Sequence, residues 1–522
     1  MFTLQYGKLT GAIYIFLIIF LIMIGCDDTI DCDGNNGDDY QNGTDWTIMV
    51  YGDGDNNLET FLLYDVQEMK RGYVNNQGLN LIMLADRIDG ETSSSDGFGE
   101  DFTDTRLYRI TQDEAKRISG DSDFPEITKS SYYEADMGDA ETLKKFIKFC
   151  KANYPADRYA LILWNHGDGV RSKGGGNNLD YKGICADDTN GSILYTAEIT
   201  DVLTENESVD LIGFDACLMG SVEVAYQYRP GDNGFNADVM IASPALEWGK
   251  GWDYYNILKR IKKGGGENDE TDETVGGNEK YYDPASMTAL HLGGIIVEEQ
   301  RDSTYSQGEQ SLACYDLSKV EAVKTSVDTL AVALYDDEEK DNFEDIRDSG
   351  SNPDTLHYFN SGVADEWIAW PFFDLYDLCE RTSTSPVFDT SIQNDASAIM
   401  DAVDEMIIYS FGGSGYTAFE EGKNGVHIFF PDGDREIYDE YLEIDVRHWI
   451  YQWWYNALVT NDDYSSGFYY GNMDWCINGA TPDNGDVENW FEMLDAWFDY
   501  TVSNWPSTLG SFPQGGSNRY NW

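Results

Sequence analysis

Basic residues are scarce in this chain of 522 residues: 34 Lys and Arg stand against 95 Asp and Glu, which gives a formal charge of −61. Nucleic-acid binding as the main activity is excluded, because it depends on clustered Lys and Arg that pair with phosphates. The same shortage disfavours adhesion to anionic lipid through protein charge, whereas basic peptides, metal cations or a saline medium suit so negative a surface. Since 41% of the residues are hydrophobic and 14% aromatic, the chain can build a sizeable core.

The N-terminal apolar run, residues 12–24, is too short for a comfortable membrane span of about 20 residues but fits the core of a signal peptide. It leads into the sequence MIGC at residues 23–26, which resembles a bacterial lipobox. The resemblance implies cleavage before Cys26 and a lipid on its thiol; an ordinary secretion signal or a short anchor is the alternative. We therefore expect a signal peptide over 1–25, an acidic tether over 26–44, and a protein that is anchored at the cell envelope or secreted.

None of the eight cysteines shows a CxxC or Cys/His spacing, so no zinc site is indicated. If Cys26 carries a lipid and Cys217 is reactive, six cysteines remain. An extracytoplasmic location would permit disulfides among these six. We expect most of them to be buried as small apolar residues.

Short apolar runs recur from Trp46 onward. They cover residues 46–51, 79–84, 159–164, 209–214 and 239–242. Continuous runs of this kind suit strands that are buried on both faces of a parallel sheet. Between them a helix is predicted over 140–153, where apolar residues recur at helical spacing. Alternating strands and helices predict an α/β fold with its site at the carboxyl ends of the strands.

The second half of the chain is less regular. Further strands are predicted over 311–315, leading into a helix capped near Asp316, and over 425–431. Residues 264–280 form an acidic, low-complexity insertion loop. Residues 461–522 are rich in Trp and Tyr, and the spacing of Trp490, Leu494 and Trp497 predicts a C-terminal helical layer. An exposed aromatic platform for glycans is the alternative for this segment.

Histidine is also scarce, with five in the chain. His166 follows the third apolar run in the sequence WNHGDG, and Cys217 follows the fourth in GFDACLMG. Neighbouring parallel strands would bring an imidazole and a thiol to the same edge of a sheet, where the base can hold the sulfur as a thiolate. His166 lies 51 residues upstream of Cys217, which fits a caspase-like order. The alternative is that both side chains are structural.

Several longer blocks surround these residues. They are WTIMVYGDGDNNLE from Trp46, MGDAETLKKFIKF from Met137, LILWNHGDG from Leu161, GICADDTNG from Gly183 and DLIGFDACLMGSVEVAY from Asp210. Together they resemble the clostripain family of cysteine peptidases, family C11 of the caspase-like clan, and weaker matches continue toward residue 454. The resemblance implies a peptidase domain over 45–460. It also implies a caspase-like fold, with a mostly parallel central sheet and helices on both faces.

Carried over to this chain, the resemblance implies a cysteine endopeptidase with Cys217 as nucleophile and His166 as general base and acid. The backbone N–H groups of Gly167 and Cys217 would stabilise the oxyanion. A non-catalytic surface lipoprotein that binds peptide or glycan on the same scaffold is the alternative function. Another acyl-transferring thiol enzyme, such as a transpeptidase or amidase, would share the dyad.

Relatives of this kind tend to cleave protein or peptide substrates after Arg or Lys. Asp215, two residues before the nucleophile, matches the acid at the base of the P1 pocket; a turn residue that accepts backbone N–H bonds is the alternative. Glu247 is a candidate for a second pocket acid, although its surroundings are less acidic than the family pattern. Lys250 nearby would weaken the attraction for basic P1 residues.

Two further expectations come from the resemblance. Some relatives cut themselves between the His and Cys blocks, and here the linker offers Lys173 and Lys182 beside a run of glycines; an ordinary surface loop is the alternative. The chemistry requires no cofactor, but Ca²⁺ supports some relatives. Asp53 and Asp55 supply closely spaced oxygens for Ca²⁺, without the full twelve-residue loop and its terminal Glu; turn chemistry is the simpler explanation.

Overall fold

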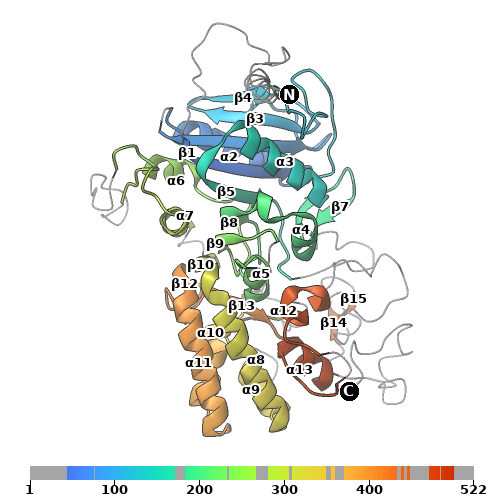
Figure 1. Cartoon of the computed structure of the whole chain (residues 1–522), viewed down its shortest axis with the longest axis vertical. Coiled ribbons are helices and arrows are strands. Elements are labelled where there is room, and N and C mark those ends of the chain that lie inside the picture. Colours follow the sequence, from blue (N-terminus) through green and yellow to red (C-terminus); the bar gives the residue numbers. More distant parts are fainter. Residues whose placement is uncertain are drawn as a thin grey trace, which may run out of the picture. The chain divides into compact units, whose positions relative to one another are not determined.

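A nine-stranded sheet in the order β12-β10-β9-β8-β5-β1-β2-β3-β4 organises the chain (Figure 1). The five central strands are parallel. They are β1 (Thr44–Gly54), β2 (Leu79–Arg87), β5 (Ala156–Trp164), β8 (Val209–Asp215) and β9 (Ala237–Ala242). Antiparallel strands complete both edges. They are β3 (Arg106–Thr111), β4 (Glu114–Ile118), β10 (Ser311–Asp316) and β12 (Ile407–Gly412).

The computed structural model describes only part of the chain. The described residues are 44–75, 77–170, 183–231, 234–265, 280–304, 308–348, 354–358, 370–431, 437–439, 444–446, 470–481 and 484–498. The predicted signal peptide, Cys26, almost all of the tether, Lys173, Lys182 and most of the 264–280 loop lie outside them. No helix within the described ranges is both long enough and apolar enough to cross a bilayer.

Helices cover both faces of the sheet, because the central strands are apolar on both sides. Ile48 and Val50 of β1 pack with helices α2 (Glu59–Gly72), α6 (Tyr254–Arg260) and α7 (Ala289–Thr304). Met49 and Tyr51 face the other core, with helices α3 (Ala140–Asn153), α4 (Thr196–Val202) and α5 (Val222–Gln227). This alternation confirms the predicted strands buried on two faces and the α/β class.

The helix predicted over 140–153 is α3, and its sequence explains both its start and its packing. Asp139 caps the N-terminus by accepting a hydrogen bond from the Glu141 N–H. Leu143, Phe146, Ile147 and Cys150, the apolar residues at helical spacing, are all fully buried. Cys150 is one of five described cysteines that are buried. The others are Cys185, Cys314, Cys379 and Cys476.

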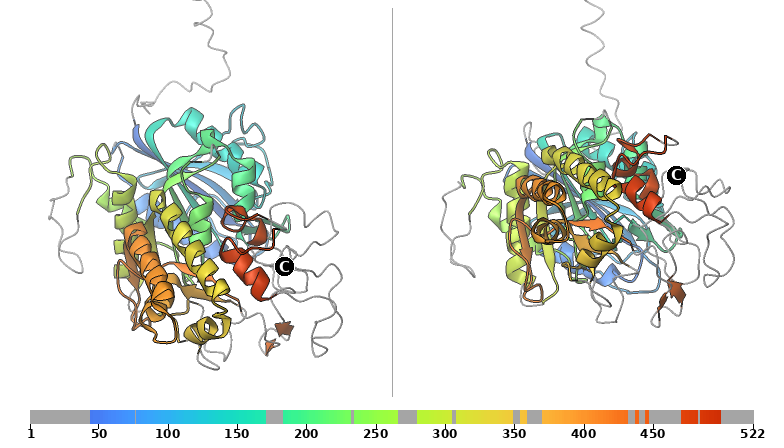
Figure 2. Two further views of the ribbon diagram at one scale, coloured as in Figure 1. Left: turned by 60° about the horizontal axis from the view of Figure 1, so that its bottom comes forward. Right: turned by 90° about the horizontal axis from the view of Figure 1, so that it is seen from below.

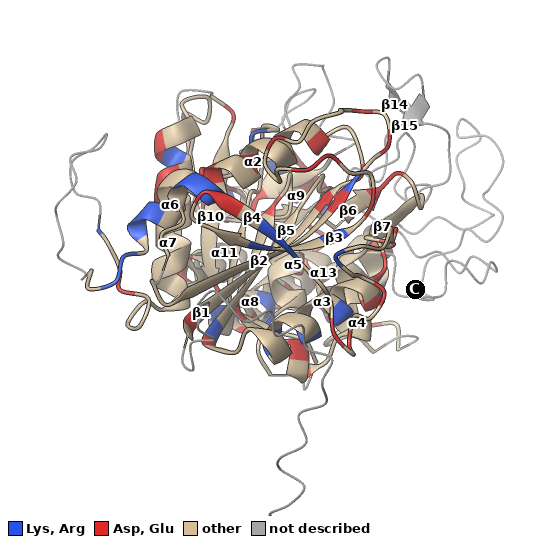
Figure 3. Cartoon of the chain, turned by 90° about the horizontal axis from the view of Figure 1, so that it is seen from above, with Lys and Arg blue, Asp and Glu red and all other residues tan. Residues whose placement is uncertain are grey.

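Beyond the sheet, helices pack on the same core. They are α8 (Val320–Asp336), α9 (Lys340–Arg347), α10 (Leu375–Thr384) and α11 (Thr390–Met406). Helices α8 and α11 contact each other along their lengths (Figure 2). Asp316 caps the short 3₁₀ turn that leads into α8, near the helix start predicted from the sequence. Acidic residues are spread over many helices and loops rather than confined to one segment (Figure 3).

The smaller elements complete the described structure. They are β6 (Ile184–Asp187) with β7 (Ser192–Leu194), β11 (Phe372–Asp374) with β13 (His427–Phe429), β14 (Ile437–Asp439) with β15 (Ile444–Val446), α12 (Asp474–Ile477) and α13 (Trp490–Trp497). Trp490 and Leu494 of α13 are buried in the core, and Trp497 is half-buried against it. The aromatic residues of α13 therefore pack on the same core as the sheet and its helices.

Candidate active site

Strands β5 and β8 bring the His and Cys blocks together. They pair in parallel with Trp164 opposite Asp215, so His166 and Cys217 each lie two residues beyond the same register position. The Asn165 N–H donates to the Asp215 carbonyl oxygen at 3.3 Å, which continues the pairing past the strand ends. A Cβ atom at Gly167 would collide with the Cys217 carbonyl oxygen. The two blocks therefore lie side by side at the carboxyl edge of the sheet, and this close approach requires glycine at position 167.

The chain reverses sharply directly after Cys217. Leu218 is buried and has a φ of 63°, a left-handed conformation that is rare for a side chain other than glycine. The Leu218 N–H donates to the Ala245 carbonyl oxygen at 2.9 Å. Nε2 of His427 lies 3.0 Å from the Leu218 carbonyl oxygen. His427 is fully buried and stacks on Phe372, so it supports this turn from the interior of the protein.

The Cys217 sulfur contacts the main chain of Glu247. The Glu247 N–H lies 3.1 Å from Sγ, and Sγ lies 3.4 Å from the Glu247 carbonyl oxygen. Burial raises the pKa of the Cys217 thiol to about 12, and the Glu247 N–H opposes this shift only in part. The thiol is therefore neutral in this state of the protein.

The His166 ring lies 2.7 Å from the side chain of Asn57, measured from Nε2 to Oδ1. Its backbone N–H donates to Asn165 Oδ1, and Asn165 Nδ2 donates to Asp53 Oδ2 at 2.7 Å. Burial lowers the pKa of His166 to about 4. The structure thus differs from the thiolate expected from the sequence: in a site shielded from water, a thiol and a neutral imidazole cost less than an ion pair.

Asp215 precedes Cys217 by two residues at the end of β8 and is 4% exposed. Its Oδ2 accepts hydrogen bonds from the Tyr254 hydroxyl at 2.8 Å and from the Trp252 N–H at 3.3 Å. Burial raises the pKa of Asp215 to about 7. A Cβ atom at Gly251 would lie 2.9 Å from both Asp215 carboxylate oxygens and 3.1 Å from Asp65 Oδ2, so the two acids border the same point.

Asp65 and Glu247 complete an acidic trio with Asp215. Trp164 Nε1 donates to Asp65 Oδ2 at 2.7 Å, and Trp252 Nε1 donates to Glu247 Oε1 at 3.4 Å. The remaining oxygens, Asp65 Oδ1 and Glu247 Oε2, are buried and have no hydrogen-bond donor among the described residues. Burial first, and then the charge of Asp215, raises the pKa of both groups. The carboxyl groups of Asp215 and Glu247 also share a hydrogen bond, and no basic side chain is among the contacts described for the three acids, so their surroundings favour a positive charge.

Sequence reasoning identified Asp215 and Glu247 but missed Asp65. Asp65 lies on α2, among the buried residues Leu62, Leu63 and Val66. The sequence offered one signal for Asp65, an acid on the apolar face of a helix. The contact with Asp215 could not be predicted, because 150 residues separate the two positions in the chain. Buried acids on such a face need a partner or a function.

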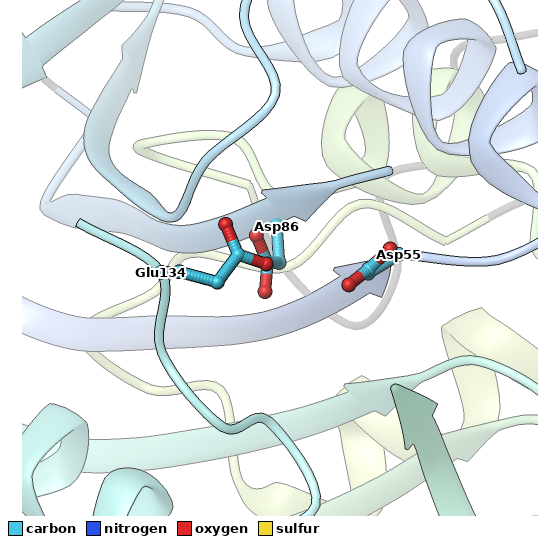
Figure 4. A group of neighbouring side chains, drawn as sticks. All are labelled: Asp55, Asp86 and Glu134. Atoms are coloured by element: carbon cyan, nitrogen blue, oxygen red, sulfur yellow. The ribbon is translucent and has the colours of Figure 1, made fainter. Parts of the chain in front are cut away.

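A second acidic cluster lies at the ends of β1 and β2. Oxygens of Asp55, Asp86 and Glu134 all lie within 4.8 Å of one another (Figure 4). Asp55 Oδ1 and Asp86 Oδ2 are buried without a hydrogen-bond donor among the described residues. Carboxylates arranged in this way fit a hard divalent cation such as Ca²⁺.

This cluster overlaps only in part with the candidate Ca²⁺ ligands taken from the sequence, Asp53 and Asp55. Asp55 belongs to it, but Asp53 does not. Asp53 Oδ1 accepts from the Asp55 N–H at 3.2 Å, and Oδ2 accepts from Asn165, so its oxygens hold the turn instead. Asp86 and Glu134, which come from distant parts of the sequence, take its place.

Comparison with known proteins agrees with this architecture. The family model described as the clostripain family, Peptidase_C11, matches residues 50–497. The chain is 48% identical over 485 residues to clostripain of Hathewaya histolytica, and the match covers 91% of this chain and 89% of that protein.

Two solved structures were also compared with the chain. An inactive zymogen C11 protease from Parabacteroides distasonis has a TM-score of 0.49 at 16% identity, covering 75% of this chain and 94% of that one. A secreted C11 cysteine protease from Bacteroides thetaiotaomicron, in complex with an irreversible peptide inhibitor, has a TM-score of 0.48 at 20% identity, covering 83% and 99%. From the family model and the relative at 48% identity, the chain belongs to the clostripain family of C11 peptidases and is a cysteine-type endopeptidase.

Proposed function

We propose that Cys217 and His166 are the catalytic dyad and that Cys217 is the nucleophile. The observation that carries this proposal is the register of β5 and β8, which places both residues at one edge of the sheet. The Cys217 thiol proton passes to the imidazole as the sulfur attacks the scissile carbonyl carbon. Because both groups start neutral, proton transfer and attack are coupled in this scheme.

The tetrahedral intermediate then breaks down in the usual order for acyl transfer. The C–N bond breaks, the imidazolium gives its proton to the leaving amine, and a thioester on Cys217 remains. Water attacks the thioester while His166 accepts a proton from it, and the thiol leaves as it regains that proton. Gly167 and Cys217 lie at the contact of the two blocks, which supports the proposal that their N–H groups stabilise the oxyanion.

For specificity we propose a basic residue at P1, with Asp65, Asp215 and Glu247 as the acids of its pocket. Their oxygens without donors and the absence of a basic residue from their described contacts support a cationic substrate group. Glu247 joins this pocket to the nucleophile through its main chain. Hydrolysis of matched peptides with Arg, Lys or Leu at P1 tests the proposal: preference for Arg and Lys supports it, and equal hydrolysis of the Leu peptide contradicts it.

We propose that Asp55, Asp86 and Glu134 bind Ca²⁺. A bound cation would neutralise these carboxylates and stabilise the turn after β1. At a Ca²⁺ concentration of about 100 Kd, binding adds about 2.7 kcal/mol to the free energy of unfolding, or roughly 3 °C in Tm for a chain of this size. The measurement is the Tm of the wild type and of Glu134→Gln with Ca²⁺ and with EDTA.

The Ca²⁺-dependent rise in Tm is expected in the wild type and strongly reduced in Glu134→Gln. Glu141→Gln is the matched control, because Glu141 is exposed on α3 and should leave the rise intact. An equal rise in the wild type and Glu134→Gln would rule out this ligand set.

Processing and location are further proposals. We propose a lipid on Cys26, which holds the protein at the bacterial cell envelope, and self-cleavage after Lys173 or Lys182. Mass spectrometry of the protein purified from its membrane fraction tests both, since it detects the lipid mass on an N-terminal Cys26 and chain ends in the linker. An unmodified N-terminus rejects the anchor, and one intact chain with full activity rejects activation by self-cleavage.

A further inference from the structure

Three neighbouring strands contribute to the His166 environment. Strand β1 lies beside β5 in the sheet, and β5 lies beside β8. Asn57 follows β1, just as His166 follows β5 and Cys217 follows β8. The Asn57 side chain reaches the ring of His166, with 2.7 Å between Oδ1 and Nε2. The carboxyl edge of the sheet therefore brings a third polar side chain to the proposed dyad.

The turn that carries Asn57 is anchored by its neighbours. Asn56 is buried, and its Nδ2 donates to the Ala186 carbonyl oxygen at 2.8 Å. The Leu58 N–H donates to Asn56 Oδ1 at 2.9 Å, and the Asp188 N–H donates to the Asp55 carbonyl oxygen at 2.9 Å. Asp55 and Asn56 thus tie the turn to the β6–β7 hairpin directly before Asn57, and the Leu58 bond closes the turn around it.

Asn57 itself has a different environment. It is exposed, and within the described part of the chain its side chain has one hydrogen-bond contact, the one to His166. The fold of the turn is held by Asn56 and by main-chain bonds, so the polar group of Asn57 is not needed for local structure. This separation of tasks points to a role for Asn57 in orienting the imidazole.

We propose that Asn57 is a positioning residue that fixes the tautomer of His166, an inference that rests on the proposed dyad. The side-chain amide oxygen of Asn57, Oδ1, accepts a hydrogen bond from Nε2–H of His166. Nδ1 is then the ring nitrogen that takes the proton from Cys217 Sγ. When Nδ1 gains that proton the ring becomes a cation, and its hydrogen bond to Asn57 becomes charge-assisted. The bond is therefore stronger in the reacting state than in the resting state, as catalysis requires.

Kinetics of variants test this role. Asn57→Leu keeps the approximate shape and removes the acceptor, and we expect kcat to fall about 10- to 100-fold while KM changes less than about twofold. Asn57→Asp keeps an acceptor and should retain kcat within about fivefold of the wild type. Thr60→Ala, an exposed neighbour on α2, is the matched control and should retain wild-type kcat. Wild-type kcat in Asn57→Leu, or an equal loss in Asn57→Asp, would overturn the proposal.

A spectroscopic measurement reads the tautomer without activity. In the full chain labelled with ¹⁵N-histidine, His166 is assigned by comparison with His166→Ala. We expect the Nε2–H form in the wild type and a mixture with the Nδ1–H form in Asn57→Leu. An identical spectrum for His166 in both proteins would overturn the inference. If the wild type proves inactive, the proposed dyad fails, but this spectrum still decides whether Asn57 orients the ring.

Discussion

Replacing Cys217 by Ala is expected to lower kcat/KM for peptide hydrolysis by roughly 10⁵-fold or more, the scale seen when a catalytic nucleophile is removed. The reason is structural: Cys217 is the described cysteine that is not fully buried, and it follows β8 beside the histidine block. The pocket acids remain in this variant, so binding of a basic peptide should persist. The measurement is kcat/KM on an arginyl peptide together with Kd for the same peptide.

Cys379→Ala provides the control for the loss of a thiol. Cys379 lies buried on α10, away from the β5–β8 edge, and its replacement should leave kcat/KM within about twofold in the folded protein. Hydrolysis by Cys217→Ala at a rate comparable to that of the wild type would assign the chemistry to another group.

Asp215→Asn is expected to lower kcat/KM for an arginyl P1 peptide by about 10²- to 10³-fold, and for a leucyl P1 peptide by less than about tenfold. The substitution keeps the shape of the side chain and its contacts to Tyr254 and Trp252, but it removes the charge that would pair with a guanidinium. Asp238→Asn, at an exposed position on β9, is the matched control and should not change the ratio. An equal loss for both peptides would show that Asp215 supports the fold rather than selecting P1.

The pH dependence of this selectivity follows from the raised pKa of Asp215. Burial raises that pKa from 3.8 to about 7, so below pH 7 the carboxyl is mostly protonated and attracts a cation weakly. The ratio of kcat/KM for arginyl over leucyl peptides should therefore rise as pH increases through about 7, and the rise should be smaller in Asp215→Asn, where only Asp65 and Glu247 remain to titrate. Because both peptides share the dyad, its own titration cancels in the ratio.

The central strands were predictable because they are buried on both faces. The apolar runs at 46–51 and 209–214 have the length of strands and are too short for typical helices. In the structure they form most of β1 and β8. Of the antiparallel strands at the edges, β10 was predicted over 311–315, but β3, β4 and β12 were not. Strand β4, with the sequence EAKRI, has no buried residue, so it lacks the apolar signal on which strand prediction depends.

The residues of the candidate site also differ in how far the sequence predicted them. His166, Cys217 and Asp215 were predictable, since each directly follows or ends a recognisable strand. Asp65 was not, because α2 reaches the site only by packing on a face of the sheet. Asn57 was not, because an Asn in the turn after β1 has the sequence signature of an ordinary turn residue. The acidic cluster proposed to bind Ca²⁺ shows the same limit: Asp86 lies within β2 and Glu134 on a loop, and only folding brings them to Asp55.

The claim that Cys217 is activated by His166 is tested most directly by labelling with an arginyl peptide that carries a thiol-reactive electrophile. Mass spectrometry of the wild type should show a single adduct, on Cys217, and the labelling rate should fall at least about 10²-fold in His166→Ala. An adduct on another residue, or equal labelling rates in the two proteins, would contradict the assignment of these two residues as the dyad.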